Sequence, residues 1–498
     1  MRVPTNPRTL WPTLILVSGI PRIAGAFALP NAFGDAYVYI RVIGEMSTKM
    51  SNGTFGLTDL YGFWLPLYQL ISAVVNVFLR NGFYAGKIVS ALFGIGSCLL
   101  IYSIVLRLTA RPQAALLGFL LIALNPLHIT YSASAMTDIP HAFFVLASLY
   151  FALKRGWVLA AVFAALAGLT RVESWMFLAL IPAIQLLRER RISITALLIL
   201  IIPPLFWFYI SWKAAGSWLA CFAARQQYHD WLLAMNPALA HFTLASVLRD
   251  SAILIVSTNT AVMISASIAG WILLKRLPRG LNRLSLPQDL QGILAPAVYF
   301  FAFLVLLLTA YLTHQQPMIF PRYGLLLFSL GIPILMWTVL RLRRQRPLWA
   351  RCILVSVIAL CVFDASIQLV GAVGSLNQTS AQRAVGDYLH DHFDPNSNAT
   401  IFSDEGTATV MSGIPEKKFL TSSDAPRDRA GFLAFLKEKH VEYLVFVNKL
   451  DSTPVKLFPE LKTGTTTETF EPMMHSRSRF LRMDIWLYRM RDGAVARS

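Results

Sequence analysis

Four short polar segments of the chain carry side chains that can take up a proton or bind an anion. Carboxylates accept protons, and the planar fork of an arginine matches the oxygens of a phosphate. Each segment adjoins a long apolar run, and a charged side chain inside a membrane costs on the order of 3 kcal/mol, so it needs a partner or a function. The segments are GDAYVYIR at 34–41, SASAMTDIPH at 132–141, GLTRVESW at 168–175 and PMIFPRYGL at 317–325.

The first segment places one acid just after the first apolar run. If residues 35–46 form a helix, Asp35 and Tyr39 share one face and Arg41 lies on another, which suits a helix on the membrane surface. The alternative is that Asp35 only caps the start of this helix, since Asp is a common N-cap.

The second segment predicts the start of a helix at Asp138, because Ile139 and Pro140 follow it and proline favours the first helical turn. His141 is near enough to share a ligand with Asp138. The N-terminus of a helix also attracts phosphate. Again, the alternative is a simple cap.

The third and fourth segments contribute arginines. Arg171 and Glu173 separate two apolar runs and form either an anion site or an ordinary polar turn. Arg322 opens an apolar run with Tyr323 beside it, and the pair suits either phosphate or an interfacial anchor.

Composition indicates a membrane protein that crosses the bilayer many times. The chain is 56% hydrophobic and 14% charged, with a mean hydropathy of +0.56. Its net charge of +18 does not indicate nucleic acid binding, because residues 375–498 are balanced and the excess lies in short loops between apolar runs.

The apolar runs predict a mainly α fold, a transmembrane bundle of about 11–13 spans. A run at 63–79 is at the lower length limit, and we expect it to lie on the surface or re-enter rather than cross. The other runs are 10–29, 84–106, 112–131, 139–154, 156–170, 174–187, 193–213, 250–274, 291–313, 322–340 and 351–372.

Charge distribution and composition predict two domains. Residues 1–374 form the membrane domain, in which the first outer loop, 30–83, carries surface helices. With 63–79 not crossing, the basic loops gather on one face, which is cytoplasmic by the positive-inside rule. All four polar segments then lie on the outer face.

Residues 375–498 have the alternating patterns of a small extracytoplasmic α/β domain. AQRAVGDYLHDHF and DRAGFLAFLKEKH read as helices. ATIFSD and VEYLVFV read as buried strands, and RMDIWLYRMR reads as a final strand.

In the order of its polar segments and in its predicted topology, the chain resembles the GT-C superfamily of membrane glycosyltransferases. This superfamily includes protein O-mannosyltransferases, aminoarabinose transferases and arabinofuranosyltransferases. The segments that carry the resemblance are GDAYVYIR, FWLPLYQL, MTDIPHAFF, GLTRVES and PRYGLLL. The resemblance covers roughly residues 10–340, and the tail is also similar to bacterial members. Two departures are the single acid at Asp35, where many members have two, and the absence of a WWDYG-type segment, which argues against an oligosaccharyltransferase.

The resemblance implies a multi-pass enzyme of the bacterial cytoplasmic membrane. Such an enzyme transfers a sugar from a polyprenyl-phosphate donor to a lipid, glycan or protein acceptor on the outer face. It also implies that Asp35 and Asp138 are catalytic. A polytopic transporter or flippase for an anionic or lipid-linked substrate is the alternative function.

Chemistry then suggests roles for the polar residues. Phosphate is already a good leaving group, so one carboxylate suffices as base and inversion is expected. We assign the base to Asp35. Asp138 either orients the acceptor or, with His141, holds a divalent cation such as Mg²⁺ or Mn²⁺; no cofactor is otherwise indicated. Substrate contacts are expected from Tyr39, Arg41, Arg171, Glu173, Arg322 and Tyr323.

Overall fold

The computed structural model describes residues 7–235, 237–276, 288–448, 452–478 and 483–491. The chain divides into two compact units. The first comprises Met1–Leu29 and Ile43–Ala372, and the second comprises Pro30–Val42 and Val373–Ser498. Helices α2 and α16 each contribute residues to both units.

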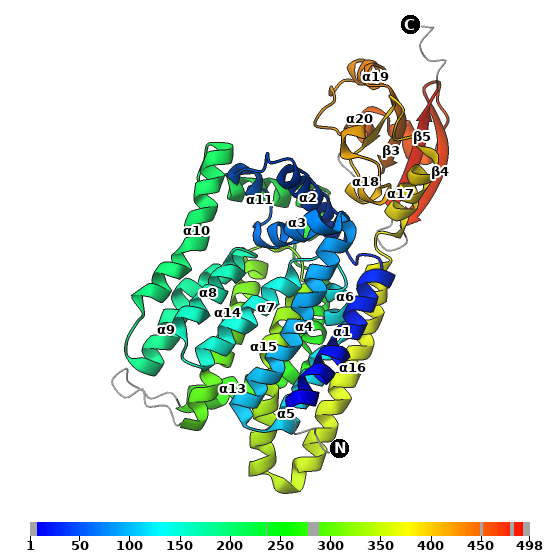
Figure 1. Ribbon diagram of the computed structural model, residues 1–498. Helices are drawn as coiled ribbons and strands as arrows, with labels where there is room; N and C mark the ends of the chain where they lie inside the picture. The colour runs from blue at the N-terminus through cyan, green and yellow to red at the C-terminus, as the bar shows by residue number, and fades with distance from the viewer. Residues whose placement is uncertain (1–6, 236, 277–287, 449–451, 479–482, 492–498) are drawn as a thin grey trace. The chain divides into compact units, whose positions relative to one another are not determined.

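The first unit is a bundle of α-helices (Figure 1). Among the described residues, six helices are long and apolar enough to cross a membrane, or up to eight if each of two bent pairs is one span. The predicted mainly α, multi-pass membrane fold is therefore confirmed. The helices are α1 (Pro7–Ala28), α2 (Gly34–Ser51), η1 (Leu57–Leu60), α3 (Leu67–Leu79), α4 (Gly82–Thr109), α5 (Pro112–Ala123), α6 (Pro126–Ser132), α7 (Asp138–Leu153), α8 (Trp157–Gly168), η2 (Val172–Met176), α9 (Phe177–Glu189), α10 (Ile194–Ala215), α11 (Ala220–Met235), η3 (Pro237–Ala240), α12 (Leu244–Thr258), α13 (Thr260–Arg276), α14 (Gln288–Leu312), α15 (Pro321–Gln345), η5 (Pro347–Trp349) and α16 (Ala350–Leu376).

Several helices of the bundle are short for a membrane span. α7, α8 and α9 have 16, 12 and 13 residues, at or below the length of about 17 that spans the hydrocarbon. Counting each run as one crossing gave 11–13 spans, whereas helix length and composition together give six to eight in the part of the chain that the structure describes. The 13 residues of α3 extend only about 20 Å, so this helix has the length of a surface or re-entrant helix, as expected for 63–79.

Two apolar runs that look continuous in the sequence are broken helices. α5 and α6 meet at 61°, at Asn125 and Pro126; the proline lacks an N–H, and the Asn125 side chain accepts a 2.8 Å hydrogen bond from the backbone of His128. α12 and α13 meet at 88° at Asn259, whose φ is +77°. Both breaks leave helix ends inside the bundle.

The basic turns that follow α4, α7, α9 and α15 lie at one end of the bundle (Figure 1). The starts of α7 and α15, and η2 between α8 and α9, lie at the other end. This separation agrees with the sorting of charges that the sequence predicted.

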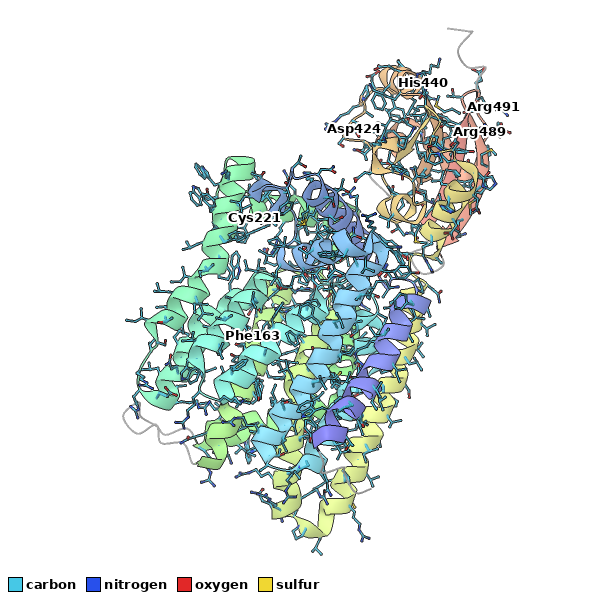
Figure 2. The ribbon with its side chains drawn as sticks, viewed as in Figure 1. Phe163, Cys221, Asp424, His440, Arg489 and Arg491 are labelled. Carbon is cyan, nitrogen blue, oxygen red and sulfur yellow. The ribbon has the colours of Figure 1, made fainter. Side chains whose placement is uncertain are left out.

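Side chains fill the space between these helices (Figure 2). Phe163 of α8 stacks on Phe151 with ring centroids 5.3 Å apart, and Cys221 of α11 is buried with Leu65 and Trp207. The bundle thus has a continuous apolar core beneath its polar end.

The second unit contains a five-stranded sheet with the order β2-β1-β3-β5-β4. β1, β2 and β3 are parallel, and β5 is antiparallel to both β3 and β4. The expected strands at β1, β3 and β5 and the helices α17 and α19 are present, whereas β2 and β4 were not anticipated. The elements are α17 (Ser380–His392), β1 (Thr400–Ser403), α18 (Gly406–Met411), η6 (Glu416–Lys418), β2 (Phe419–Leu420), α19 (Arg429–Glu438), β3 (Val441–Val447), α20 (Thr453–Leu457), η7 (Pro459–Thr463), β4 (Phe470–Ser478) and β5 (Met483–Met490).

Alternation along β3 produces two apolar layers. Tyr443, Val445 and Val447 pack on α17 and α18, while Leu444 and Phe446 pack on the face covered by α19. A strand buried on both faces reads as a nearly continuous apolar run, as VEYLVFV does apart from the partly exposed Glu442.

Candidate functional site

Three of the four polar segments meet at one pocket at the polar end of the bundle. The pocket has a volume of about 700 Å³ up to its open mouth. Its polar lining comes from the start of α7, from η2 and its preceding turn, and from the start of α15. These side chains are Asp138, His141, Arg171, Glu173, Gln316, Arg322 and Tyr323.

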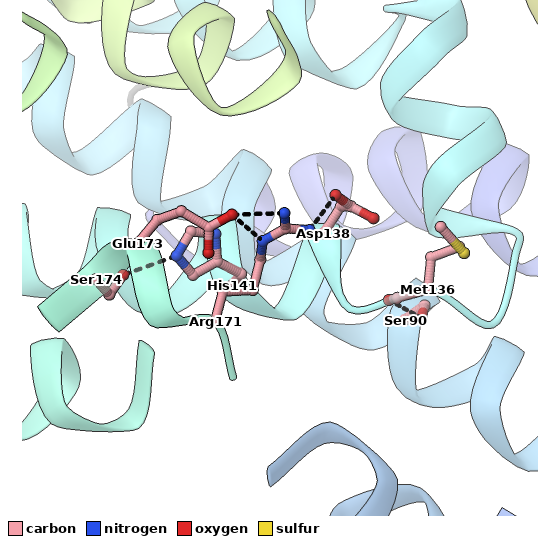
Figure 3. Close-up of polar contacts among 7 residues, drawn as sticks. All are labelled: Ser90, Met136, Asp138, His141, Arg171, Glu173 and Ser174. Atoms are coloured by element: carbon pink, nitrogen blue, oxygen red, sulfur yellow. Dashed lines mark hydrogen bonds and ion pairs between the residues drawn. The ribbon is translucent and has the colours of Figure 1, made fainter. Parts of the chain in front are cut away.

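The loop between α6 and α7 positions Asp138. The Ser90 hydroxyl of α4 donates a 3.1 Å hydrogen bond to the carbonyl of Met136 (Figure 3). Gly94 of α4 lies against Ser132, where any added side chain would collide. The loop is therefore fixed to α4, and Asp138 begins α7 as its spacing predicted.

Arg171 lies between two carboxylates (Figure 3). Its Nη1 donates a 2.9 Å hydrogen bond to Oδ1 of Asp138, and its Nη2 donates a 2.7 Å hydrogen bond to Oε1 of Glu173. Burial raises the pKa of the Glu173 carboxyl, but the adjacent guanidinium has the larger net effect and lowers the pKa to about 2. Arg171 therefore donates hydrogen bonds to two carboxylates and has little capacity left for a phosphate.

Asp138 retains one oxygen that is available to a ligand. Its side chain is only 7% exposed, and Oδ2 accepts no hydrogen bond from any residue that the structure describes. Buried acceptors are normally satisfied, so this atom points to a donor supplied by substrate or water. Asp138 is thus held by one oxygen, and the other, buried oxygen has no hydrogen-bond partner among the described residues.

His141 is fixed one turn further along α7. Its Nε2 lies 2.7 Å from the Ser174 hydroxyl, and its ring packs edge-on to Phe303 with centroids 6.0 Å apart (Figure 3). The histidine is buried and joins α7 to η2.

The other wall of the pocket is apolar. α14 contributes Phe303, Leu306, Leu307 and Ala310, and α15 contributes leucines next to Arg322. The Arg322 guanidinium lies over the rings of Phe320 and Tyr323, at 5.1 and 5.6 Å from their centroids. The pocket therefore combines charged groups with an apolar wall.

The first polar segment belongs to the second unit. Asp35 is half-buried in the first turn of α2, Tyr39 is buried, and exposed Arg41 has its Nε 3.8 Å from Oε1 of Glu416. These residues are not among those that line the pocket. Their predicted roles as base and substrate contacts stay predictions.

The predicted metal pair is not part of a larger cluster. Within the described ranges, no three His, Cys, Asp or Glu side chains come together as a metal site would require. Asp138 Oδ1 and His141 Nε2 are both close to protein partners, as described above. The prediction that Asp138 and His141 hold a divalent cation stays a prediction, and the mechanism proposed below routes no step through a metal.

Several pocket residues were not predicted from the sequence. Ser174 is next to Glu173 in the sequence, but nothing in the sequence indicates that it contacts His141. The sequence did not identify the apolar wall of α14, because Phe303 and Leu307 look like lipid-facing residues of any membrane span. Only the proximity of α14 to α7 and α15 identifies them.

Comparison with known proteins gives a match to a family model, matches to solved structures, and no match among curated proteins. Residues 66–156 match the family model of dolichyl-phosphate-mannose-protein mannosyltransferase. The crystal structure of ArnT from Cupriavidus metallidurans in the apo state aligns over 97% of this chain and 98% of that chain, with 12% identity and a TM-score of 0.56. The chain has the fold of ArnT.

The same ArnT bound to undecaprenyl phosphate aligns over 96% of this chain and 98% of that chain, with 12% identity and a TM-score of 0.47. No curated protein matches the chain. The family model covers α3 to α7 and so includes Asp138 and His141. Together these matches confirm the resemblance to membrane glycosyltransferases of the GT-C superfamily that the sequence predicted.

Proposed function

We propose that this protein transfers a sugar from a polyprenyl-phosphate donor to an acceptor on the extracytoplasmic face of the bacterial cytoplasmic membrane. The observation that carries the proposal is the convergence of Asp138, Arg171 and Arg322 on one pocket with an apolar wall. A donor that is part sugar phosphate and part lipid needs both kinds of surface. The family model that matches residues 66–156, named for a polyprenyl-phosphate sugar, supports the donor class.

The phosphate of the donor is assigned to Arg322. A guanidinium stabilises the charge that develops as the sugar–phosphate bond breaks. Arg171 is close to both Asp138 and Glu173, so we assign it the positioning of these carboxylates. The polyprenyl chain would extend along Leu307 and the neighbouring apolar wall.

The reaction is a single displacement with inversion at the anomeric carbon. The acceptor oxygen bonds to that carbon, the carbon–oxygen bond to phosphate breaks, and its electron pair leaves with the polyprenyl phosphate. Oδ2 of Asp138 accepts a hydrogen bond from another polar group of the acceptor and orients it. Asp35 takes the proton of the attacking hydroxyl, and phosphate needs no general acid.

The test is transfer of labelled sugar from a polyprenyl-phosphate donor to acceptors in membranes of a strain that lacks the protein. Loss of a general base lowers the rate about 100- to 10,000-fold, whereas loss of a helix cap costs only about 1 kcal/mol of stability. We therefore expect Asp35→Asn to lose transfer at a normal melting temperature, and Asp138→Asn to be impaired as well. Asp230→Asn, an exposed residue of α11, is the matched control.

Near wild-type transfer by Asp35→Asn would remove this residue as the base. Normal transfer by both Asp35→Asn and Asp138→Asn would contradict the site. A transporter or flippase, the alternative function, would leave the donor intact, so donor cleavage by wild type separates the two.

A further inference from the structure

A second cavity lies at the opposite, basic end of the bundle from the pocket. Its volume is about 520 Å³, within the range of ligand sites. It lies between the turn that joins α7 to α8 and the turn that joins α9 to α10. Its lining is Arg155, Gly156, Trp157, Val158, Leu159, Gln185, Arg191, Ile192 and Ser193.

The charge in and around this cavity is positive. Arg155 is exposed and, among the described residues, forms no ion pair with a carboxylate. The Arg191 side chain is 78% exposed, with its Nε 3.3 Å from Glu189. Behind the lining, the Arg188 guanidinium lies 5.9 Å from the ring centroid of Trp157. Three arginines thus lie in or near the cavity, with Glu189 as the one acid beside them.

The start of α10 adds to this positive field. The Ser193 hydroxyl accepts a hydrogen bond from the backbone N–H of Ala196, and Oε1 of buried Gln185 accepts a 2.9 Å hydrogen bond from the N–H of Ser193. These contacts fix the N-terminus of a 22-residue helix at the cavity wall. The dipole at a helix N-terminus favours an anion there.

The rest of the lining is apolar and exposed. Val158, Leu159 and Ile192 have 43%, 47% and 46% of their surface exposed. A small soluble anion would leave this surface uncovered. An anion attached to acyl chains would cover it.

We propose that this cavity binds the headgroup of an anionic phospholipid between Arg155 and Arg191, with its acyl chains against Val158 and Leu159. The ends of membrane helices lie at the level of the headgroups, where clustered basic residues between helices attract anionic lipids. Arg343 and Arg344 at the end of α15 offer a comparison, since they are exposed at the same end of the bundle but do not line the cavity.

The experiment is a native mass spectrometry titration of the full-length protein in neutral detergent with phosphatidylglycerol and with phosphatidylcholine of the same acyl chains. We expect wild type to prefer phosphatidylglycerol, and Arg155→Gln with Arg191→Gln to weaken that binding about 10- to 30-fold. Arg343→Gln with Arg344→Gln should leave phosphatidylglycerol binding unchanged. Neither pair of substitutions should change the binding of phosphatidylcholine. Melting temperatures verify that each variant is folded, and the two single variants replace the double variant if it does not fold.

Two competitors identify the source of the bound anion. Inorganic phosphate and glycerophosphoglycerol, which lacks chains, should displace the lipid only at far higher concentrations. Displacement by inorganic phosphate at the lipid's own concentration would show a soluble anion site and overturn the proposal. Equal binding of the two phospholipids, or equal losses in the Arg343 and Arg344 control, would show general basic attraction and overturn it as well.

Discussion

At the scale of single residues, Arg171 organises the pocket. It joins Asp138 at the start of α7 to Glu173 in η2, so two carboxylates share one guanidinium. Removing one partner from such an arrangement leaves an unpaired charge in a confined site, which is more costly than the pair itself is stabilising. The arginine that the sequence suggested for phosphate is, in the structure, close to both acids.

The ion pair predicts a pH dependence of stability. The pKa of Glu173 is about 2 in the folded protein, below its ordinary value of 4.5. Folding therefore favours the ionised form, and the stabilisation is complete above the ordinary value and lost as the pH falls toward 2.

We expect the difference in melting temperature between wild type and Glu173→Gln in detergent to be constant from about pH 7 to 5.5 and to shrink below about pH 4.5. Glu438→Gln, whose side chain is 71% exposed in the C-terminal unit, controls for acid effects unrelated to the pair. A difference that already decreases between about pH 7 and 6 would contradict the low pKa.

At the scale of elements, α16 connects the two broken helices. Nδ2 of Asn125, at the α5–α6 break, donates a 2.7 Å hydrogen bond to Oε1 of Gln368. Nε2 of Gln368 donates a 2.6 Å hydrogen bond to the carbonyl of Val256, at the end of α12. α6 leads to Asp138, and the end of α12 packs against Gly324, two residues after Arg322. One glutamine thus links the backbones that carry opposite sides of the pocket.

We predict that Gln368→Leu lowers both stability and transfer. It leaves a buried amide and a carbonyl unpaired, at about 1–3 kcal/mol each, and lets the two sides of the pocket shift. The measurement is the transfer rate well below the melting temperature, where the variant is fully folded. Ser366→Ala, an exposed position on the same helix, should be nearly silent; unaltered transfer in Gln368→Leu would show that the bridge is only structural.

The sequence predicted the helices better than the breaks within them. Charges at Asp138, Arg171 and Arg322 identified most of the polar lining because such groups are rare beside apolar runs. The breaks at Asn125 and Asn259 were missed, since one asparagine in an apolar run does not reveal a bend of 61° or 88°. The partners that satisfy these breaks come from α16, more than 100 residues further along the chain.

At the scale of the whole molecule, the segment that carries Asp35 groups with the C-terminal domain rather than with the bundle. Pro30–Val42 and Val373–Ser498 form one compact unit. Tyr37 is fully buried, which raises the pKa of its hydroxyl, and Thr379 and Arg383 of the C-terminal unit are among the groups that act on it. The domain therefore supports the segment that holds the predicted base.

Cutting the chain after Gly374 should accordingly separate two functions. We expect the truncated protein to bind the polyprenyl-phosphate donor in detergent, because the pocket lies in the first unit, but to lose transfer at least about 100-fold, because Asp35 loses its support. Binding of a labelled donor and transfer are measured on the same preparation. Complete loss of donor binding in a well-folded truncated protein would contradict this division.

Orientation has its own test. Single cysteines at exposed Asn52 and Asn396 in a cysteine-free protein should react with an impermeant thiol reagent outside intact cells, and one at Arg343 should react only after lysis. The reverse pattern would place the pocket on the cytoplasmic side.

The most direct test of the account asks whether the lipid donor occupies the pocket. Leu307 lines it from α14, whereas Val305 on the same helix is 60% exposed. With the photoreactive p-benzoylphenylalanine in place of either residue, a labelled polyprenyl-phosphate sugar should crosslink at 307 and not at 305, and unlabelled polyprenyl phosphate should suppress the product. Equal labelling at both positions, or none at 307 in a protein that still transfers sugar, would contradict the proposed donor site.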